Sequence, residues 1–147
     1  MSDVNRTLAR RWFEEVWNER RAETIDELMS PEAVGHMEGG IVRGPGDFKA
    51  AWTALCFAFP DLRVTVEDVV AEGDRAVVRW SARGRHTGPG LGAPASDREA
   101  SFRGMTWLEF ANGRIVRGWD SWNLGQLMQE LGAVTLHASG PATERRE

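Results

Sequence analysis

The 147-residue chain contains one cysteine, Cys56, and no tyrosine. A single cysteine excludes an intrachain disulfide and a zinc site built on paired cysteines, and the three histidines are far apart in the sequence. The lack of tyrosine excludes any mechanism that needs a phenol hydroxyl as a donor. We therefore expect no metal site, and a chemistry carried by other side chains.

Long apolar runs and clusters of one charge are also missing. No stretch approaches the length of a membrane span, and the first six residues include no apolar segment of the signal-peptide type. Lysine and arginine are spread along a chain whose net charge is -4 and whose pI is near 5.5, which argues against a nucleic-acid partner. We expect a cytoplasmic protein that binds neither nucleic acid nor a membrane.

Tryptophan, in contrast, occurs seven times in a chain of ordinary hydrophobic content, 41%. Seven indoles exceed what the core of one small domain usually takes, and an aromatic excess often lines a ligand pocket. The length predicts a single domain, which we place at residues 1–137. The polar residues 138–147 are expected to form a flexible C-terminal tail.

Helical periodicity dominates the first sixty residues. An apolar stripe of period 3.6 predicts a helix over about residues 3–19. Thr24 and Glu27 have capping-box spacing and predict a second, short helix over 25–29. A third helix is expected to be capped by Asp47. Between the last two, "AVGHME" is typical of a short extended piece and "GGIVRGPG" of a loop.

The period then changes to 2, which predicts four long strands, "LRVTVED", "AVVRWSARGRH", "ASFRGMTWLEF" and "IVRGWDSWN". Asn112-Gly113 is a strong hairpin signal, and "LGQLMQELG" is typical of a helix that ends at Gly132. Helices followed by a strand meander indicate an α+β fold, with helices covering one face of a curved antiparallel sheet. A pocket is expected in the concave side of such a sheet.

The chain resembles the SnoaL-like polyketide cyclase, or ester cyclase, family of the nuclear transport factor 2-like superfamily. The resemblance runs from about residue 5 to residue 133, and its most specific pieces are "FPDLRVTVEDVVAEGDRAVVRW" and "HTGPGLG". It implies a cone with three N-terminal helices around a central cavity, and an enzyme that uses no cofactor and no metal. Members of this fold often pair through the exposed sheet face, so a homodimer or higher homo-oligomer is expected.

The best-known family members close a ring of an aromatic polyketide by intramolecular aldol condensation, in antibiotic biosynthesis. A cavity carboxylate acts there as acid and base, so the resemblance implies lyase or isomerase chemistry on a small hydrophobic carbonyl compound. The first alternative is a protein of the same fold that binds a small hydrophobic ligand without catalysis. The second is epoxide hydrolysis, which needs paired carboxylates bridged by arginine and a water held by tyrosine and asparagine.

Asp120 is the leading candidate for the acid–base group. Trp119 precedes it, and Trp122 lies two residues further on the same strand face. Apolar walls raise the pKa of a carboxyl group through desolvation, toward the range that suits proton transfer. The alternative is a strand-end aspartate that hydrogen-bonds a neighbouring backbone group or an arginine. The residues alone leave both interpretations open.

One position departs from the family pattern. The family usually has Trp, three residues, then Asp at the end of this strand, and here the last position is Asn123. An amide can orient a substrate carbonyl or a water but cannot accept a proton at neutral pH. Alternation places Asn123 on the face of Trp119, opposite Asp120. Either Asp120 carries the proton transfer, or the chemistry has been lost or changed.

The resemblance also points to a cavity histidine at His36, which could orient a substrate oxygen or move a proton. A structural histidine at the mouth of the sheet is the alternative. For His86 a loop-stabilising role is favoured over ligand contact. Seven residues form the expected substrate-binding set, Trp119, Trp122, His86, Trp52, Phe57, Thr106 and Met105. We expect only one or two of the N-terminal aromatic residues at the cavity wall, namely among Trp12, Phe13, Trp17, Trp52, Phe57 and Phe59.

Overall fold

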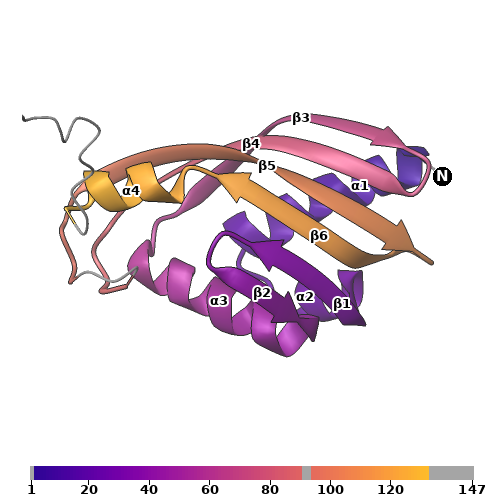
Figure 1. The fold of residues 1–147 in the computed structure, drawn as a ribbon, viewed down its shortest axis with the longest axis horizontal. Helices are drawn as coiled ribbons and strands as arrows, with labels where there is room; N and C mark the ends of the chain where they lie inside the picture. Colours follow the sequence, from indigo (N-terminus) through magenta and orange to yellow (C-terminus); the bar gives the residue numbers. More distant parts are fainter. Residues whose placement is uncertain (1, 91–93, 133–147) are drawn as a thin grey trace, which may run out of the picture.

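The structure is a computed structural model that describes residues 2–90 and 94–132 (Figure 1). The expected tail at 138–147 and the end of the expected domain lie outside these residues. Within them, no helix is long and apolar enough to cross a membrane.

The four long strands follow the N-terminal helices along the chain, as the sequence predicts, but two further strands lie between the second and third α-helices. The helical elements of the described residues are α1 (Ser2–Trp12), the π-helix η1 (Phe13–Asn18), α2 (Ala22–Leu28), α3 (Gly44–Ala58) and α4 (Leu124–Glu130). The strands are β1 (Met29–Met37), β2 (Gly40–Arg43), β3 (Arg63–Glu72), β4 (Arg75–Arg85), β5 (Glu99–Ala111) and β6 (Arg114–Trp122).

One six-stranded sheet has the order β2-β1-β6-β5-β4-β3 (Figure 1). The four long strands β3 to β6 form the expected antiparallel meander, and β1 pairs with β2 in the same manner. The expectation of a wholly antiparallel sheet is wrong at one position, because β1 runs parallel to β6. The expected loop "GGIVRGPG" also contains β2. Pairing between the first and the last strand is set by the global path of the chain, which local periodicity does not encode.

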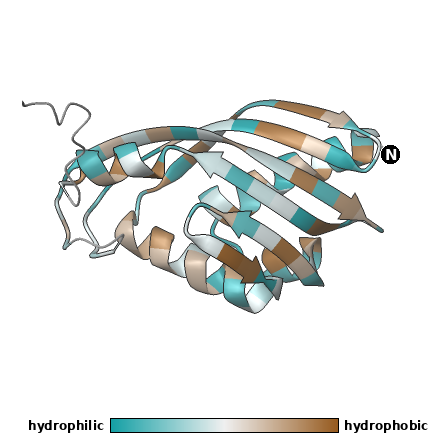
Figure 2. Ribbon diagram, in the orientation of Figure 1, coloured by the Kyte–Doolittle hydropathy of each residue, from teal (hydrophilic) through white to brown (hydrophobic). Residues whose placement is uncertain are grey.

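The sheet curves over α1, α2 and α3, which lie on its concave side (Figure 1). Strand β4 shows why, since buried Val78 and Trp80 alternate with exposed Arg79 and Arg83. The same alternation of hydrophobic and hydrophilic residues runs along the strands in Figure 2. The predicted α+β cone is thus confirmed, and its hollow lies between the helices and the sheet.

Three local predictions about the helices need correction. Asp47 is not the N-cap of α3, which begins at Gly44; its Oδ2 accepts the backbone N–H of Arg43 at 3.0 Å from inside the first turn. Thr24 does not cap α2, which begins at Ala22; its hydroxyl instead donates to Glu15 Oε1 at 2.6 Å. The first helix does not stay α-helical to residue 19, because its last six residues form the π-helix η1. Six residues are too few for the apolar spacing to distinguish a π-helix from an α-helix.

The hairpin turn predicted at Asn112-Gly113 is present. Asn112 and Gly113 both have positive φ, 54° and 77°, as a two-residue hairpin turn requires between β5 and β6. The hairpin, together with a one-residue register shift between Glu109 and Phe110, places Thr106 opposite Asp120. The turn therefore connects a local sequence signal to the geometry of the site.

Candidate active site

An apolar hollow lies between the concave face of the sheet and the helices. It encloses about 870 Å³ of space that no atom fills, part of which is open to solvent. Apart from backbone and indole groups, the polar side chains among its described lining residues are Asp120, Thr106 and His36. Four of the seven tryptophans line it, Trp12, Trp17, Trp80 and Trp122. The aromatic excess of the sequence thus lies largely at this cavity.

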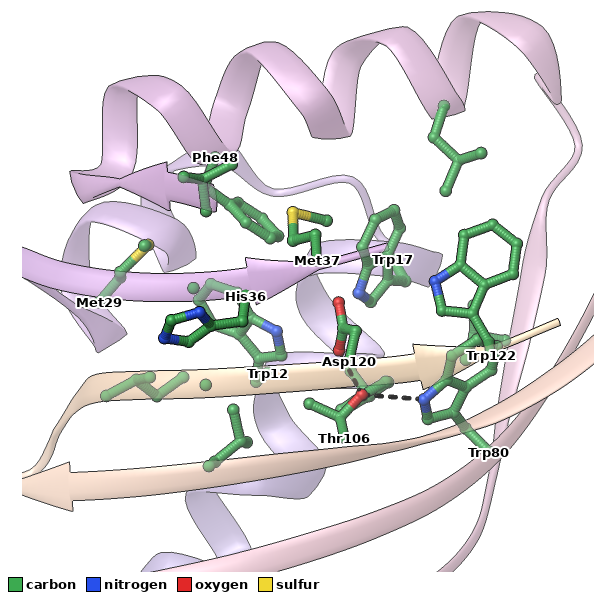
Figure 3. A pocket seen from close by; sticks show the side chains of 18 of the residues that line it. Trp12, Trp17, Met29, His36, Met37, Phe48, Trp80, Thr106, Asp120 and Trp122 are labelled. Atoms are coloured by element: carbon green, nitrogen blue, oxygen red, sulfur yellow. Dashed lines mark hydrogen bonds between the residues drawn. The ribbon is translucent and has the colours of Figure 1, made fainter. Parts of the chain in front are cut away.

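Asp120 stands on β6 and points into the hollow (Figure 3). Its Oδ1 accepts a 2.6 Å hydrogen bond from the Thr106 hydroxyl, and that hydroxyl accepts one of 3.0 Å from Trp80 Nε1. An indole nitrogen only donates, so the Thr106 proton is committed to the carboxyl group. The chain Trp80–Thr106–Asp120 crosses three adjacent strands and fixes the carboxyl orientation (Figure 3).

Burial among apolar groups raises the pKa of Asp120 to about 6, because the charged form loses its hydration. The hydrogen bond from Thr106 acts in the opposite direction, since it stabilises the carboxylate. The nearby carboxylate of Glu38 raises the pKa further by repulsion. Near neutral pH, the group therefore has both protonation states within reach, as general acid–base catalysis requires.

Glu38 lies in the turn between β1 and β2. Its Oε2 accepts the backbone N–H of Trp122 at 2.9 Å, which ties the turn to the end of β6. The sequence does not point to Glu38, because the contact joins positions 84 apart in the chain. Its effect on Asp120 is electrostatic.

His36 is not brought together with Asp120. It lies on β1 beside the cavity wall, opposite Trp119 in the parallel register. Its ring stacks on the Trp119 indole with a centroid distance of 5.1 Å and an interplanar angle of 9°. In Figure 3 the imidazole is turned away from Asp120. A catalytic role for His36 stays a prediction, and this geometry supplies no contact in its favour.

Asn123 lies at the N-terminus of α4 and does not line the cavity. Its Oδ1 accepts the backbone N–H of Gln126 at 3.0 Å, and its Nδ2 donates to Gln126 Oε1 at 2.7 Å. The residue is a helix cap, and the spacing of Asn123 and Gln126 is the sequence signal that reveals it. The position at which the family usually has an aspartate therefore supports α4 here.

His86 is fully buried and does not line the hollow. Its Nδ1 lies 3.0 Å from Ser96 Oγ, and its backbone carbonyl accepts from Ser96 and Asp97 at 3.1 and 2.8 Å. These bonds join the end of β4 to the segment that precedes β5. The geometry matches the loop-stabilising interpretation of the sequence.

The rest of the expected substrate-binding set divides by strand face. Thr106 and Trp122 line the cavity, whereas Met105 and Trp119 lie on the outer face, 53% and 37% exposed. Two further members belong to α3, and neither is in the cavity lining: Trp52 donates to a backbone carbonyl, and Phe57 is exposed.

The N-terminal aromatic residues contribute more to the wall than expected. Trp12, Phe13 and Trp17 all line the cavity, where the sequence predicted one or two of six. The π-helix begins at Phe13 and so reshapes the turn that carries these rings. Such π-helical turns occur often at functional sites. Trp80 is a further wall residue that was not predicted, although strand alternation with Arg79 and Arg83 places it on the buried face of β4.

Comparisons with known proteins agree with this architecture. The sequence profile of the SnoaL-like polyketide cyclases matches residues 7–131. No match was found among curated proteins. TsrD from Streptomyces laurentii is 30% identical, with a TM-score of 0.81 over 91% of this chain and 98% of that one.

Two further solved structures share the fold. A protein from Jannaschia sp. CCS1, provisionally named a SnoaL-like polyketide cyclase, is 27% identical, with a TM-score of 0.84 over 91% of this chain and 95% of that one. AclR from Streptomyces galilaeus, provisionally named a hydroxylase, is 26% identical, with a TM-score of 0.80 over 92% of this chain and 89% of that one. The profile match covers most of the sequence, and the chain belongs to the SnoaL-like polyketide cyclase family.

Proposed function

We propose that the protein is a cyclase in which Asp120 acts as acid and base in an intramolecular, aldol-type ring closure. The substrate is a hydrophobic, polyketide-like carbonyl compound. The observation that carries the proposal is a single carboxyl group in an apolar cavity, with its pKa raised to about 6 and one oxygen held by Thr106. Family membership and the provisional cyclase names of similar structures support it.

The reaction needs one group that moves a proton twice. The Asp120 carboxylate takes a proton from a carbon next to a carbonyl, and the C–H electron pair forms the enolate. The enolate carbon then attacks a second carbonyl of the same molecule and forms the C–C bond. The resulting alkoxide takes the proton back from Asp120, so the carboxylate is restored and no other reactant is consumed.

The cavity geometry suits this cycle. Thr106 holds Oδ1, which leaves Oδ2 as the oxygen turned toward the hollow (Figure 3). The apolar wall keeps bulk water from levelling the basicity of the carboxylate. Within the described lining, no second carboxyl group can share the task.

That last observation weighs against epoxide hydrolysis. Such chemistry needs paired carboxylates bridged by arginine, and the described lining includes one carboxylate and no arginine. A ligand-binding protein without catalysis is the second candidate. It is favoured by Asn123, which caps a helix at the position of the usual family acid.

Hydrogen–deuterium exchange separates the two candidates without knowledge of the natural substrate. We would follow loss of the methyl proton signal of 2-acetylnaphthalene in D₂O by NMR. The enzyme hypothesis predicts acceleration by the wild type, and loss of about 10²-fold or more of it in Asp120→Asn. Glu109→Gln, which removes a carboxylate outside the cavity lining, is the matched control. Binding of the ketone without exchange would favour the ligand-binding protein.

A further inference from the structure

The seven indole N–H groups of the chain divide into used and unused donors. Three are used within the described residues: Trp80 donates to Thr106, Trp52 to the Val16 carbonyl, and Trp107 to Glu109. Trp119 lies on the outer face, partly in solvent. The remaining three, those of Trp12, Trp17 and Trp122, have no hydrogen-bond partner among the described residues and belong to cavity-lining residues.

These unused donors reach open space. Among the described residues, the one fully buried side-chain polar atom without a partner is His86 Nε2, so no cavity indole N–H is sealed in the core. Figure 3 shows the nitrogens of Trp17 and Trp122 on the sides of their rings that face Asp120. The Asp120 oxygen not bound by Thr106 points into the same part of the hollow (Figure 3).

The free polar groups of the cavity are therefore mostly hydrogen-bond donors. Indole nitrogens donate and do not accept, and the Thr106 hydroxyl is already engaged in both directions. The Asp120 carboxyl group is the remaining acceptor among the described lining side chains, apart from His36, whose ring stacks on Trp119. A ligand that satisfies these donors brings oxygen acceptors on an apolar frame.

We propose that Trp17 and Trp122 bind the carbonyl oxygen of the substrate through their indole N–H groups, beside Asp120. The substrate class is then an apolar ketone or polyketone. This inference rests on the proposed function and deepens it: when Asp120 removes the proton, the negative charge moves to the oxygen that the two indoles hold. Fixed donors aimed at a developing oxyanion lower the barrier of such a step.

In this assignment, the indole N–H groups take the place of the tyrosine hydroxyl that the chain lacks. A tyrosine could donate a hydrogen bond and also ionise, whereas an indole N–H binds an oxygen without giving up its proton. Asp120 then carries out the proton transfer, and the two tryptophans position the substrate carbonyl and stabilise the oxyanion that forms on it. The two roles can be separated by experiment.

The test compares two probes that differ in one group, 9-fluorenone and fluorene, by equilibrium dialysis. We expect the wild type to bind the ketone more tightly, and Trp17→Phe and Trp122→Phe each to weaken fluorenone binding about threefold to tenfold. Fluorene binding should change little, which reports on altered packing. Trp107→Phe removes an indole from the outer face and should leave both affinities unchanged.

An infrared measurement keeps the test valid if a variant fails to fold. The carbonyl stretch of 9-fluorenone bound to the wild type should lie below its position in hexane, and this result needs no variant. Where the double variant Trp17→Phe/Trp122→Phe folds, it should lose the shift. A missing preference for the ketone, no binding of fluorenone, an unshifted carbonyl band, or a preference that survives in the double variant would overturn the assignment.

Asp120→Asn distinguishes this inference from the proposed function. It should keep the preference for fluorenone while losing proton exchange on 2-acetylnaphthalene. Normal exchange in Asp120→Asn with an indole-dependent ketone preference would reject the catalytic carboxylate and keep the donor pair. Loss of exchange in Asp120→Asn, together with a ketone preference that does not depend on Trp17 or Trp122, would keep the catalytic carboxylate and reject the donor pair.

Discussion

The hydroxyl of Thr106 donates a 2.6 Å hydrogen bond to Asp120 Oδ1 across the β5–β6 pair. The same hydroxyl accepts from Trp80, so its proton cannot turn elsewhere without losing that bond. The contact stabilises the carboxylate and opposes the desolvation that raises its pKa. Thr106 thus keeps the carboxyl group within a range that suits both halves of a proton-transfer cycle.

Removing this hydroxyl should raise the pKa of Asp120. Thr106→Val keeps the shape and loses the donor, so the carboxylate loses a favourable bond and the pKa moves above its wild-type value. The infrared band of the protonated carboxyl group, followed against pH, measures the shift. Thr106→Ser keeps the donor and should leave the midpoint nearly unchanged; a midpoint that falls in Thr106→Val would contradict the assigned bond.

Removing the Glu38 charge should act in the opposite direction. Glu38→Gln keeps an oxygen that can accept the Trp122 N–H and removes the repulsion on Asp120, so the pKa of Asp120 should fall. Desolvation is the larger cause, so the pKa of Asp120 should fall only part of the way toward its ordinary value. The pH at which 2-acetylnaphthalene exchange is half-maximal should move down accordingly. An upward move would show that Glu38 does not act through its charge.

Asp120→Asn should stabilise the fold at neutral and alkaline pH. A carboxyl group with a raised native pKa keeps its proton between pH 4 and 6, whereas the unfolded chain has lost it, so stability falls as pH rises through this window. A pKa of about 6 against an ordinary 3.8 corresponds to a penalty of about 3 kcal/mol above the window.

Urea unfolding of wild type and Asp120→Asn at several pH values checks this. The difference in free energy of unfolding should approach about 3 kcal/mol at pH 8 and shrink toward zero near pH 4. A constant difference, or a wild type that is more stable than the variant at pH 8, would mean that the carboxylate is not desolvated.

Gly104 makes room for the aromatic wall of the cavity. A Cβ at this position would lie 2.5 Å from Trp122 Cβ and 2.8 Å from Trp80 Cζ2. We expect Gly104→Ala to lower the free energy of unfolding by about 1–3 kcal/mol, because the strand pair or the rings must move. Gly125→Ala, where a Cβ meets nothing within 4 Å, is the control, and equal stability of Gly104→Ala and wild type in urea unfolding would contradict the packing.

Much of the fold could be predicted because its signals are local. The period-2 segments became β3 to β6, and the faces of β5 follow from alternation, so Thr106 was expected at the cavity and lies there. The joint placement of Asp120 and Trp122 follows from the same rule. The parallel pairing of β1 with β6 was missed because it depends on where the chain returns, not on either strand alone.

The site was less predictable, for physical reasons specific to each residue. Asn123 was interpreted through the family pattern, while the hydrogen bonds to Gln126 show a cap that local spacing already encoded. The turn of His36 toward Trp119 depends on strand pairing. The indole N–H of Trp80 is bonded to Thr106, whereas other cavity indoles have no partner among the described residues. This difference depends on three-dimensional contacts, which composition does not reveal.

The most direct test of the central claim is the titration of the Asp120 carboxyl carbon by NMR, with ¹³C-labelled aspartate and assignment by Asp120→Asn. The midpoint should lie near 6, because the carboxyl group is buried in the apolar cavity. A midpoint near the ordinary value of an exposed aspartate, about 4, would show a solvated carboxyl group and contradict its role in proton transfer.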